Sequence, residues 1–188
     1  MPLETCKRPP WDNRPDMPFL HKNIRLAGAQ YTDQQWYFLT LCCAQRRSVF
    51  SAPQQADWLV ESLRQEAALA GFSVYAYCVM PDHAHVLTFG LDTTSDLLRF
   101  VKRLKQRTGY EFRKRFHREL WQKKFHDHIL RQNELVPSIA AYIWMNPVRK
   151  KLCRDASEYL HSGSFVLDWK KAPQPAKSWA PPTKRSSD

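Results

Sequence analysis

Two histidines separated by one alanine, His83 and His85, are the residues whose types and spacing most directly indicate chemistry. They lie in an apolar stretch, VYAYCVMPDHAHVLTFG, in which Pro81-Asp82 places a tight bend just before them. Successive side chains of a strand point to opposite faces, so both imidazoles should share one face, about 7 Å apart along the chain. Imidazole is the commonest metal ligand near neutral pH. The pair predicts half of a metal site, with two surface histidines on an edge strand as the alternative.

Tyr142 and Asn146 form a second pair, further along the chain in a segment with helical hydrophobic spacing. Residues four apart in a helix are neighbours on one face, about 6 Å apart along the axis. A tyrosine hydroxyl is a latent nucleophile and an amide oxygen is a hard metal ligand. If this helix packs over the histidine strand, it brings an attacking oxygen and a third ligand to one cation. Taken alone, the two residues are more typical of a half-buried helix tyrosine and of a helix end before proline.

Composition indicates one basic domain rather than a membrane-spanning or disulfide-stabilised protein. The 188 residues include 29 Lys and Arg against 18 Asp and Glu, a net charge of +11, which favours nucleic acid as partner and an anionic membrane surface second. No apolar run approaches the ~18 residues of a membrane span, and the proline-rich start lacks the apolar core of a signal peptide. Five cysteines without C-x-x-C spacing predict reduced thiols in a cytoplasmic, nucleoid-associated protein.

Hydrophobic periodicity predicts the order strand, helix, strand, strand, helix, strand, helix, which is that of a ferredoxin-like α+β sandwich. Such a fold has an antiparallel sheet with helices on one face. The last helix should begin near Pro137 and stop at Asn146, because the residue before Pro147 is pushed out of the α region. The other elements are expected at 36–43, 51–70, 73–79, 83–90, from about 95 into the basic region, and in the run ending at 129–130. Polar residues are expected to cap the first two helices, namely Ser51 and one of Thr93, Thr94 or Ser95.

The helix after the histidine strand carries an almost unbroken run of positive charge. Between Arg99 and Arg115 the only acid is Glu111, so pairing within the helix does not account for the basic side chains. We therefore expect a surface that binds the phosphate backbone of DNA, with a plain solvated face as the alternative. Its residues are Arg99, Lys102, Arg103, Lys105, Arg107, Arg113 and Lys114.

A second His-x-His, His126 and His128 in WQKKFHDHILR, rivals the first as a metal site. Its surroundings are more polar, and a structural or DNA-contacting role is the favoured interpretation. Three tryptophans, Trp36, Trp121 and Trp144, are candidates for stacking on DNA bases if they are exposed. For each of them a place in the hydrophobic core is at least as good an interpretation.

The sequence YCVMPDHAHVL, followed later by YIWMNPVRKKL, resembles the single-tyrosine HUH (His-hydrophobic-His) transposases and, within them, the REP-associated tyrosine transposases of bacteria. The stretches NIRLAGAQYTDQQWYFLTLCCAQRRSVF, LKQRTGYEFRKRF and WQKKFHDHILR support the resemblance, which covers residues 23–152. The paired motifs in this order are highly specific. One residue departs from the pattern: Asp82 stands where the family more often has asparagine. A carboxylate there would form an Asx-type turn or alter the metal preference, and the sequence leaves both open.

The resemblance implies the ferredoxin-like fold and a single cation, Mg²⁺ or Mn²⁺, in the site. It also implies cleavage of single-stranded DNA beside a hairpin, in which the phenol attacks in line and leaves a 5′-phosphotyrosine and a free 3′-hydroxyl. Arg149, Lys150 and Lys151, just after the tyrosine helix, are expected to contact phosphate near the cut. By position, the metal ligands correspond to His83, His85 and Asn146, and the nucleophile to Tyr142.

The expected organisation is an extended N-terminal arm at 1–22, a catalytic domain at 23–152, and a C-terminal extension at 153–188 that is basic and disordered from about 171. The expected partner is single-stranded DNA with hairpin structure, without a membrane, and the protein is expected to be a monomer or a homodimer. Two other functions stay open. One is a non-catalytic nucleic-acid-binding module on the same fold, and the other is a Rep/relaxase-type nickase.

Overall fold

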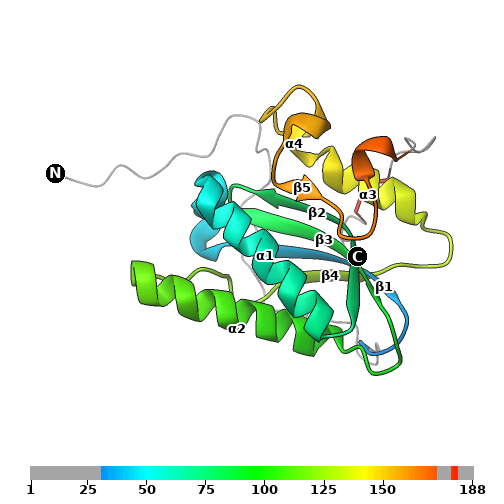
Figure 1. Cartoon of the computed structure of the whole chain (residues 1–188), viewed down its shortest axis with the longest axis horizontal. Coiled ribbons are helices and arrows are strands. Elements are labelled where there is room, and N and C mark those ends of the chain that lie inside the picture. The colour runs from blue at the N-terminus through cyan, green and yellow to red at the C-terminus, as the bar shows by residue number, and fades with distance from the viewer. Residues whose placement is uncertain (1–30, 173–178, 182–188) are drawn as a thin grey trace, which may run out of the picture.

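The computed structural model describes residues 31–172 and 179–181, and every structural statement below concerns these residues. They form one five-stranded antiparallel sheet that carries helices (Figure 1). The expected α+β class with an antiparallel sheet is confirmed. The predictions for the arm at 1–22 and for tail residues 173–178 and 182–188 lie outside the described residues. None of the helices in the described part of the chain is long and apolar enough to span a membrane.

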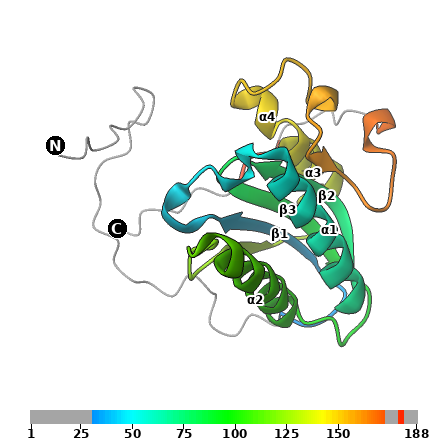
Figure 2. The same cartoon turned by 60° about the vertical axis from the view of Figure 1, so that its left-hand side comes forward.

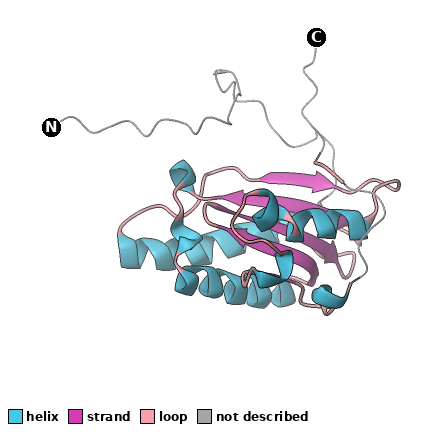
Figure 3. Cartoon of the chain, turned by 90° about the horizontal axis from the view of Figure 1, so that it is seen from above, coloured by secondary structure: helices cyan, strands magenta, loops and turns pink. Residues whose placement is uncertain are grey.

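The histidines lie on β3, and the pairing of β3 with its neighbour β1 positions them. In the order β4-β1-β3-β2-β5, β3 lies between β1 and β2, and all pairs are antiparallel. In the β1–β3 register, Cys42 lies opposite His83 and Thr40 lies opposite His85. Figure 3 shows the strands side by side. Their bounds are β1 Trp36–Cys42, β2 Phe72–Met80, β3 His83–Gly90, β4 His126–Ile129 and β5 Ser162–Gly163.

Helices cover both faces of the sheet, which corrects the expectation that they lie on one face. The helices α1 (Pro53–Leu69) and α2 (Leu97–Phe116) pack on one face, whereas α3 (Val136–Trp144) and the short α4 (Asn146–Arg149) lie on the other (Figures 1 and 2). Each face of the sheet therefore has its own hydrophobic core. The reason is that the last helix is apolar on its inner side and buries that side against β2 and β3.

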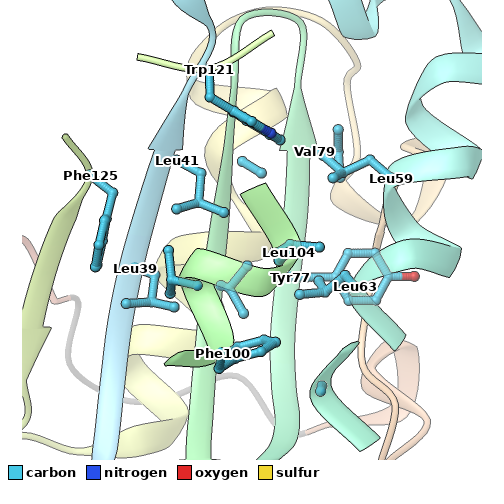
Figure 4. Packing of buried hydrophobic residues seen from close by; sticks show 14 of the residues in the cluster. Leu39, Leu41, Leu59, Leu63, Tyr77, Val79, Phe100, Leu104, Trp121 and Phe125 are labelled. Atoms are coloured by element: carbon cyan, nitrogen blue, oxygen red, sulfur yellow. The ribbon is translucent and has the colours of Figure 1, made fainter. Parts of the chain in front are cut away.

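The alternation of β3 divides its side chains between the two cores. Ala84 and Val86 point into the core beneath α1 and α2, where leucines of β1 and α2 meet (Figure 4). Leu87 points into the core beneath α3. Because side chains alternate along a strand, His83 and His85 share the face of Leu87, and so they lie on the side that α3 covers.

The helix starts differ from those expected. α1 begins at Pro53 after Ala52, without a side-chain cap, so the cap expected from Ser51 is wrong. The fixed φ of proline suits the first helical turn, where no N–H partner is required. α2 is capped by Asp96, whose carboxylate accepts from the Arg99 N–H at 3.0 Å, rather than by the three hydroxyl residues before it.

Candidate active site

His83 and His85 converge at the start of β3. Their Nε2 atoms are 3.1 Å apart, and the ring of His85 also stacks against that of Phe38 on β1, with centroids 5.4 Å apart. The bend before them is held by two backbone hydrogen bonds: Pro81 O accepts from the Phe50 N–H and Asp82 O from the Cys43 N–H, both at 2.9 Å. The two imidazoles therefore share one small space at the end of the sheet.

The second nitrogen of each imidazole is already occupied by a neighbouring oxygen. The carboxylate of Asp82 accepts a hydrogen bond from His83 Nδ1, and Oγ1 of Thr40 is hydrogen-bonded to His85 Nδ1 at 2.9 Å. An ionised carboxylate can only accept, so Nδ1 of His83 carries a proton, and Nε2 is the nitrogen that faces His85. Oxygen partners of this kind fix the tautomer and orientation of metal-binding histidines. Asp82 is thus in direct contact with a candidate ligand.

Electrostatics around the pair favour a neutral His85 beside an ionised Asp82. Burial lowers the pKa of His85 well below 6.5, and the nearby charges of His83, Arg149 and Arg46 lower it further. Burial would raise the pKa of Asp82, but the hydrogen bond and charge of His83 and the guanidinium of Arg46, 3.2 Å away, outweigh it and lower the pKa. A neutral imidazole is the form that binds metal.

The spacing of the two Nε2 atoms fits a shared cation. If two nitrogens each lie about 2.1 Å from an octahedral ion and the nitrogen–metal–nitrogen angle is a right angle, the nitrogens are about 3 Å apart. Among the described residues there is no cluster of three or more His, Cys, Asp or Glu side chains that could hold a metal. An amide oxygen matches the preference of hard divalent cations, and Asn146 is the third ligand that the sequence predicts.

Tyr142 and Asn146 lie on either side of a break in the last helix. α3 ends at Trp144, two residues earlier than expected. A new helical turn, α4, begins at Asn146, and Pro147 lies in its first turn. The Asn146 side chain is buried, and its Nδ2 donates to the Tyr142 carbonyl at 3.2 Å. Because the amide nitrogen is engaged in this way, the amide oxygen is the atom left to act as a ligand.

The ring of Tyr142 is bounded by aromatic side chains. Its centroid is 6.2 Å from that of Phe38, 6.4 Å from that of His85 and 5.1 Å from that of Trp179. The helix thus places the phenol on the same side of the sheet as the histidine pair, as the interpretation of the sequence required. The guanidinium of Arg149 lies over the remaining side of the ring, 4.0 Å from its centroid.

In the second His-x-His, His128 is paired with a carboxylate. β4 is an edge strand, as expected, and His128 Nε2 is 2.7 Å from a carboxylate oxygen of Glu134. The other oxygen of Glu134 accepts from the indole N–H of Trp179 at 3.0 Å. His128 therefore helps to hold the residue that packs on the Tyr142 ring, which is a structural role.

Two residues of the expected DNA surface face another helix instead. Arg103 Nε and Arg107 Nη1 lie 3.1 and 3.2 Å from the two carboxylate oxygens of Glu66, a buried residue of α1. Both arginines thus neutralise a buried acid that lies far away in the sequence, while part of each side chain stays exposed, so the expectation that they bind phosphate remains a prediction.

Two more basic side chains of α2 have partners. Lys105 Nζ donates to the backbone carbonyls of residues 122 and 123 at 2.8 and 2.9 Å, and Arg113 pairs with Glu119 at 2.7 Å. Several basic side chains of this surface are therefore paired or hydrogen-bonded within the protein. The expected DNA-binding residues that are exposed, with or without a partner, are Arg99, Lys102, Arg103, Arg113, Lys114, Arg149 and Lys150.

Several residues at the site had no signal in the sequence. Thr40, Phe38 and Arg46 come from β1 and the turn after it, and Trp179 comes from the end of the chain. Thr40 could be inferred from the pairing of β1 with β3, because it then lies opposite His85. No local sequence pattern indicates Phe38, Arg46 or Trp179. Of the three tryptophans considered for base stacking, Trp121 and Trp144 are buried in the cores and Trp36 is partly buried against Tyr75 and Phe89.

Comparison with known proteins gives the family and supports the fold. A family model described as "Transposase IS200 like" matches residues 31–146. A solved REP-associated tyrosine transposase bound to a REP hairpin superposes with a TM-score of 0.65 at 19% identity, covering 84% of this chain and 92% of the other. A putative transposase from Deinococcus radiodurans R1 gives a TM-score of 0.46 at 24% identity, covering 57% of this chain and 88% of the other. No curated protein matches the sequence.

The likeness to the REP-associated enzyme concerns the fold, since the identity is low. The family match is a statement about sequence, and it takes in both the histidine strand and the tyrosine helix. Because it spans more than half of the 188 residues, the chain belongs to the IS200-like transposases, enzymes that cut DNA and transfer the cut strand.

Proposed function

We propose that this transposase cleaves single-stranded DNA through a covalent link to Tyr142, at a site where His83, His85 and Asn146 hold Mg²⁺ or Mn²⁺. One observation carries the proposal. Two imidazole Nε2 atoms converge to 3.1 Å on the face of the sheet beneath α3, and the ring of the only tyrosine of that helix lies 6.4 Å from the ring of His85. A nucleophile and a cation site in one place are what phosphodiester transfer requires.

The chain's own groups have distinct tasks in this reaction. A divalent cation at the site would polarise a non-bridging oxygen of the scissile phosphate and offset charge in the transition state. His83 and His85 turn their Nε2 atoms toward each other, and their Nδ1 atoms are held by Asp82 and Thr40. The Oη of Tyr142 loses its proton and bonds to phosphorus, the bond from phosphorus to the 3′-oxygen breaks, and that oxygen takes up a proton. The 5′-phosphotyrosine keeps the phosphodiester linkage, so a later 3′-hydroxyl can reverse the step.

For the substrate we propose DNA with a hairpin next to the cut, of the REP type. The solved enzyme of similar fold is bound to a REP hairpin, which supports this choice. The net charge of +11 and the exposed basic residues of α2 and α4 suit a phosphate backbone. We expect log Kd to rise linearly with log salt concentration, and an affinity that stays flat between low and moderate salt would contradict a backbone-binding surface.

The deciding experiment is incubation of the protein with a hairpin-bearing single strand and Mn²⁺, followed by denaturing electrophoresis and peptide mass spectrometry. A covalent protein–DNA adduct on Tyr142 is expected, absent in Tyr142→Phe and reduced in His83→Ala. Tyr110→Phe is the matched control, because Tyr110 is 70% exposed on α2 and removal of its hydroxyl should leave the adduct unchanged. Tight binding without an adduct, in both Mg²⁺ and Mn²⁺, would instead indicate a non-catalytic DNA-binding module.

A further inference from the structure

Arg149 contacts Tyr142 at two points. Its Nη2 donates to the Tyr142 backbone carbonyl at 2.7 Å, and its guanidinium carbon lies 4.0 Å from the centre of the phenol ring. A guanidinium stacks well on an aromatic face because it is planar and weakly hydrated. A cation near the carbonyls at the end of a helix is also favoured by the helix dipole. One side chain thus fixes both the main chain and the ring of the same residue.

Apart from Arg149, the phenol of Tyr142 is oriented by contacts with aromatic rings. Within the described residues its hydroxyl has no hydrogen-bond partner, so the ring is placed by its packing alone. Phe38 and Trp179 meet it at interplanar angles of 80°, as edge-to-face contacts. Arg149 is the charged group among these neighbours, and it supplies the contact on the ring that the aromatic side chains leave open.

Arg149 reaches back across the junction between α3 and α4. Residues seven apart in a straight helix lie two turns away from each other, about 10 Å along the axis. α4 restarts at Asn146 and ends at Arg149, and the side chain folds over the last turn of α3 to reach the Tyr142 carbonyl. The guanidinium therefore lies beside the nucleophile, although the residue as a whole is exposed to solvent.

We propose that Arg149 is the positioning residue for the nucleophile: it holds the phenol ring of Tyr142 in the orientation for attack. This inference rests on the proposed role of Tyr142 and adds to it. It differs from the simpler role of a phosphate contact, because a positioning residue acts on the chemical step and a phosphate contact acts on DNA affinity. A misplacement of reacting atoms by about 1 Å can slow a reaction about 100-fold.

The test separates these roles by measuring adduct formation at saturating DNA and, separately, DNA affinity. Arg149→Gln is expected to slow adduct formation about 10- to 100-fold, with a loss of affinity below about tenfold, as for one lost phosphate contact. Adduct formation by Arg149→Lys should stay slow, because an ammonium group is not planar and cannot stack on the phenol ring. In Arg149→Ala, free guanidinium should restore part of the rate. Arg154→Gln removes a charge from the same region without touching the ring and serves as control.

A second measurement does not depend on activity. In protein labelled with 3-fluorotyrosine, the ¹⁹F resonance of Tyr142, assigned by its loss in Tyr142→Phe, should shift or broaden in Arg149→Gln and stay in place in Arg154→Gln. An unchanged resonance would overturn the inference whether or not any adduct forms. A normal rate for Arg149→Lys, or a loss confined to affinity, would overturn it as well. An adduct that persists in Tyr142→Phe would refute the proposed function instead, and the resonance would still decide whether Arg149 holds the ring.

Discussion

The substitution Asp82→Asn tests whether the carboxylate beside His83 tunes the cation site. Asparagine keeps the shape and one acceptor oxygen but removes the charge that faces His83 Nδ1 and Arg46. Loss of such an outer partner typically lowers metal affinity 10- to 100-fold. Asparagine still accepts a hydrogen bond, and the Asp82 side chain is 27% exposed. We therefore expect Asp82→Asn to lower the affinity for Mn²⁺ by about tenfold, which corresponds to about 1.4 kcal/mol of binding free energy. Asp82→Ala, which removes the acceptor, should approach 100-fold.

The assay is titration of the DNA-free protein with Mn²⁺, followed by calorimetry or by the electron paramagnetic resonance of the free ion. Asp92→Asn makes the same change of charge at an exposed position beyond the other end of β3 and should bind Mn²⁺ like the unmodified protein. If Asp82→Asn binds within twofold of the unmodified protein while His83→Ala does not bind, the role assigned to the carboxylate is wrong. If His83→Ala also binds normally, the cation site itself is wrong.

Three further outcomes are expected. Glu66→Gln should lower the free energy of unfolding by about 2 kcal/mol, and so Tm by about 4–8 °C, without weakening DNA binding; the cost is below that of a fully buried pair because both arginines are partly exposed. Burial raises the pKa of Cys43 and of Cys78 to about 12, so in native protein at pH 8 iodoacetamide should leave both unmodified, and modification by mass spectrometry before unfolding would contradict this. Burial would raise the pKa of Glu134, but hydrogen bonds from the Arg131 N–H, Trp179 and His128 hold it below 4.5. A depressed carboxylate pKa stabilises the fold above about pH 4.5 and loses that contribution as the pH falls, so Glu134→Gln should flatten the acid limb of a stability–pH curve.

The parts of the site that follow from local periodicity could be predicted. A strand repeats every two residues, so His83 and His85 had to share a face wherever the strand lay. A helix repeats every 3.6 residues, so Tyr142 and Asn146 had to be neighbours, although Pro147 moved the helix boundary. The order of strands and helices was also visible, because each element has its own hydrophobic pattern.

Charge was the feature that the sequence described least well. The run on α2 looked unpaired because its partner, Glu66, is on α1 and the two meet only when both helices pack on the same face of the sheet. Pairing within one helix can be seen in a sequence at spacings of three or four residues, but pairing between helices cannot. Part of the expected DNA surface is therefore also engaged in holding the two helices together.

By itself, the sequence determined which residues are adjacent along one strand or one helix, because those relations depend only on the geometry of a single element. Only the tertiary structure decided that α3 lies over the histidine face, that Phe38 and Trp179 enclose the Tyr142 ring, and that Arg149 folds back onto it. These contacts join segments far apart in the chain, and they depend on how the apolar faces of the helices pack on the sheet.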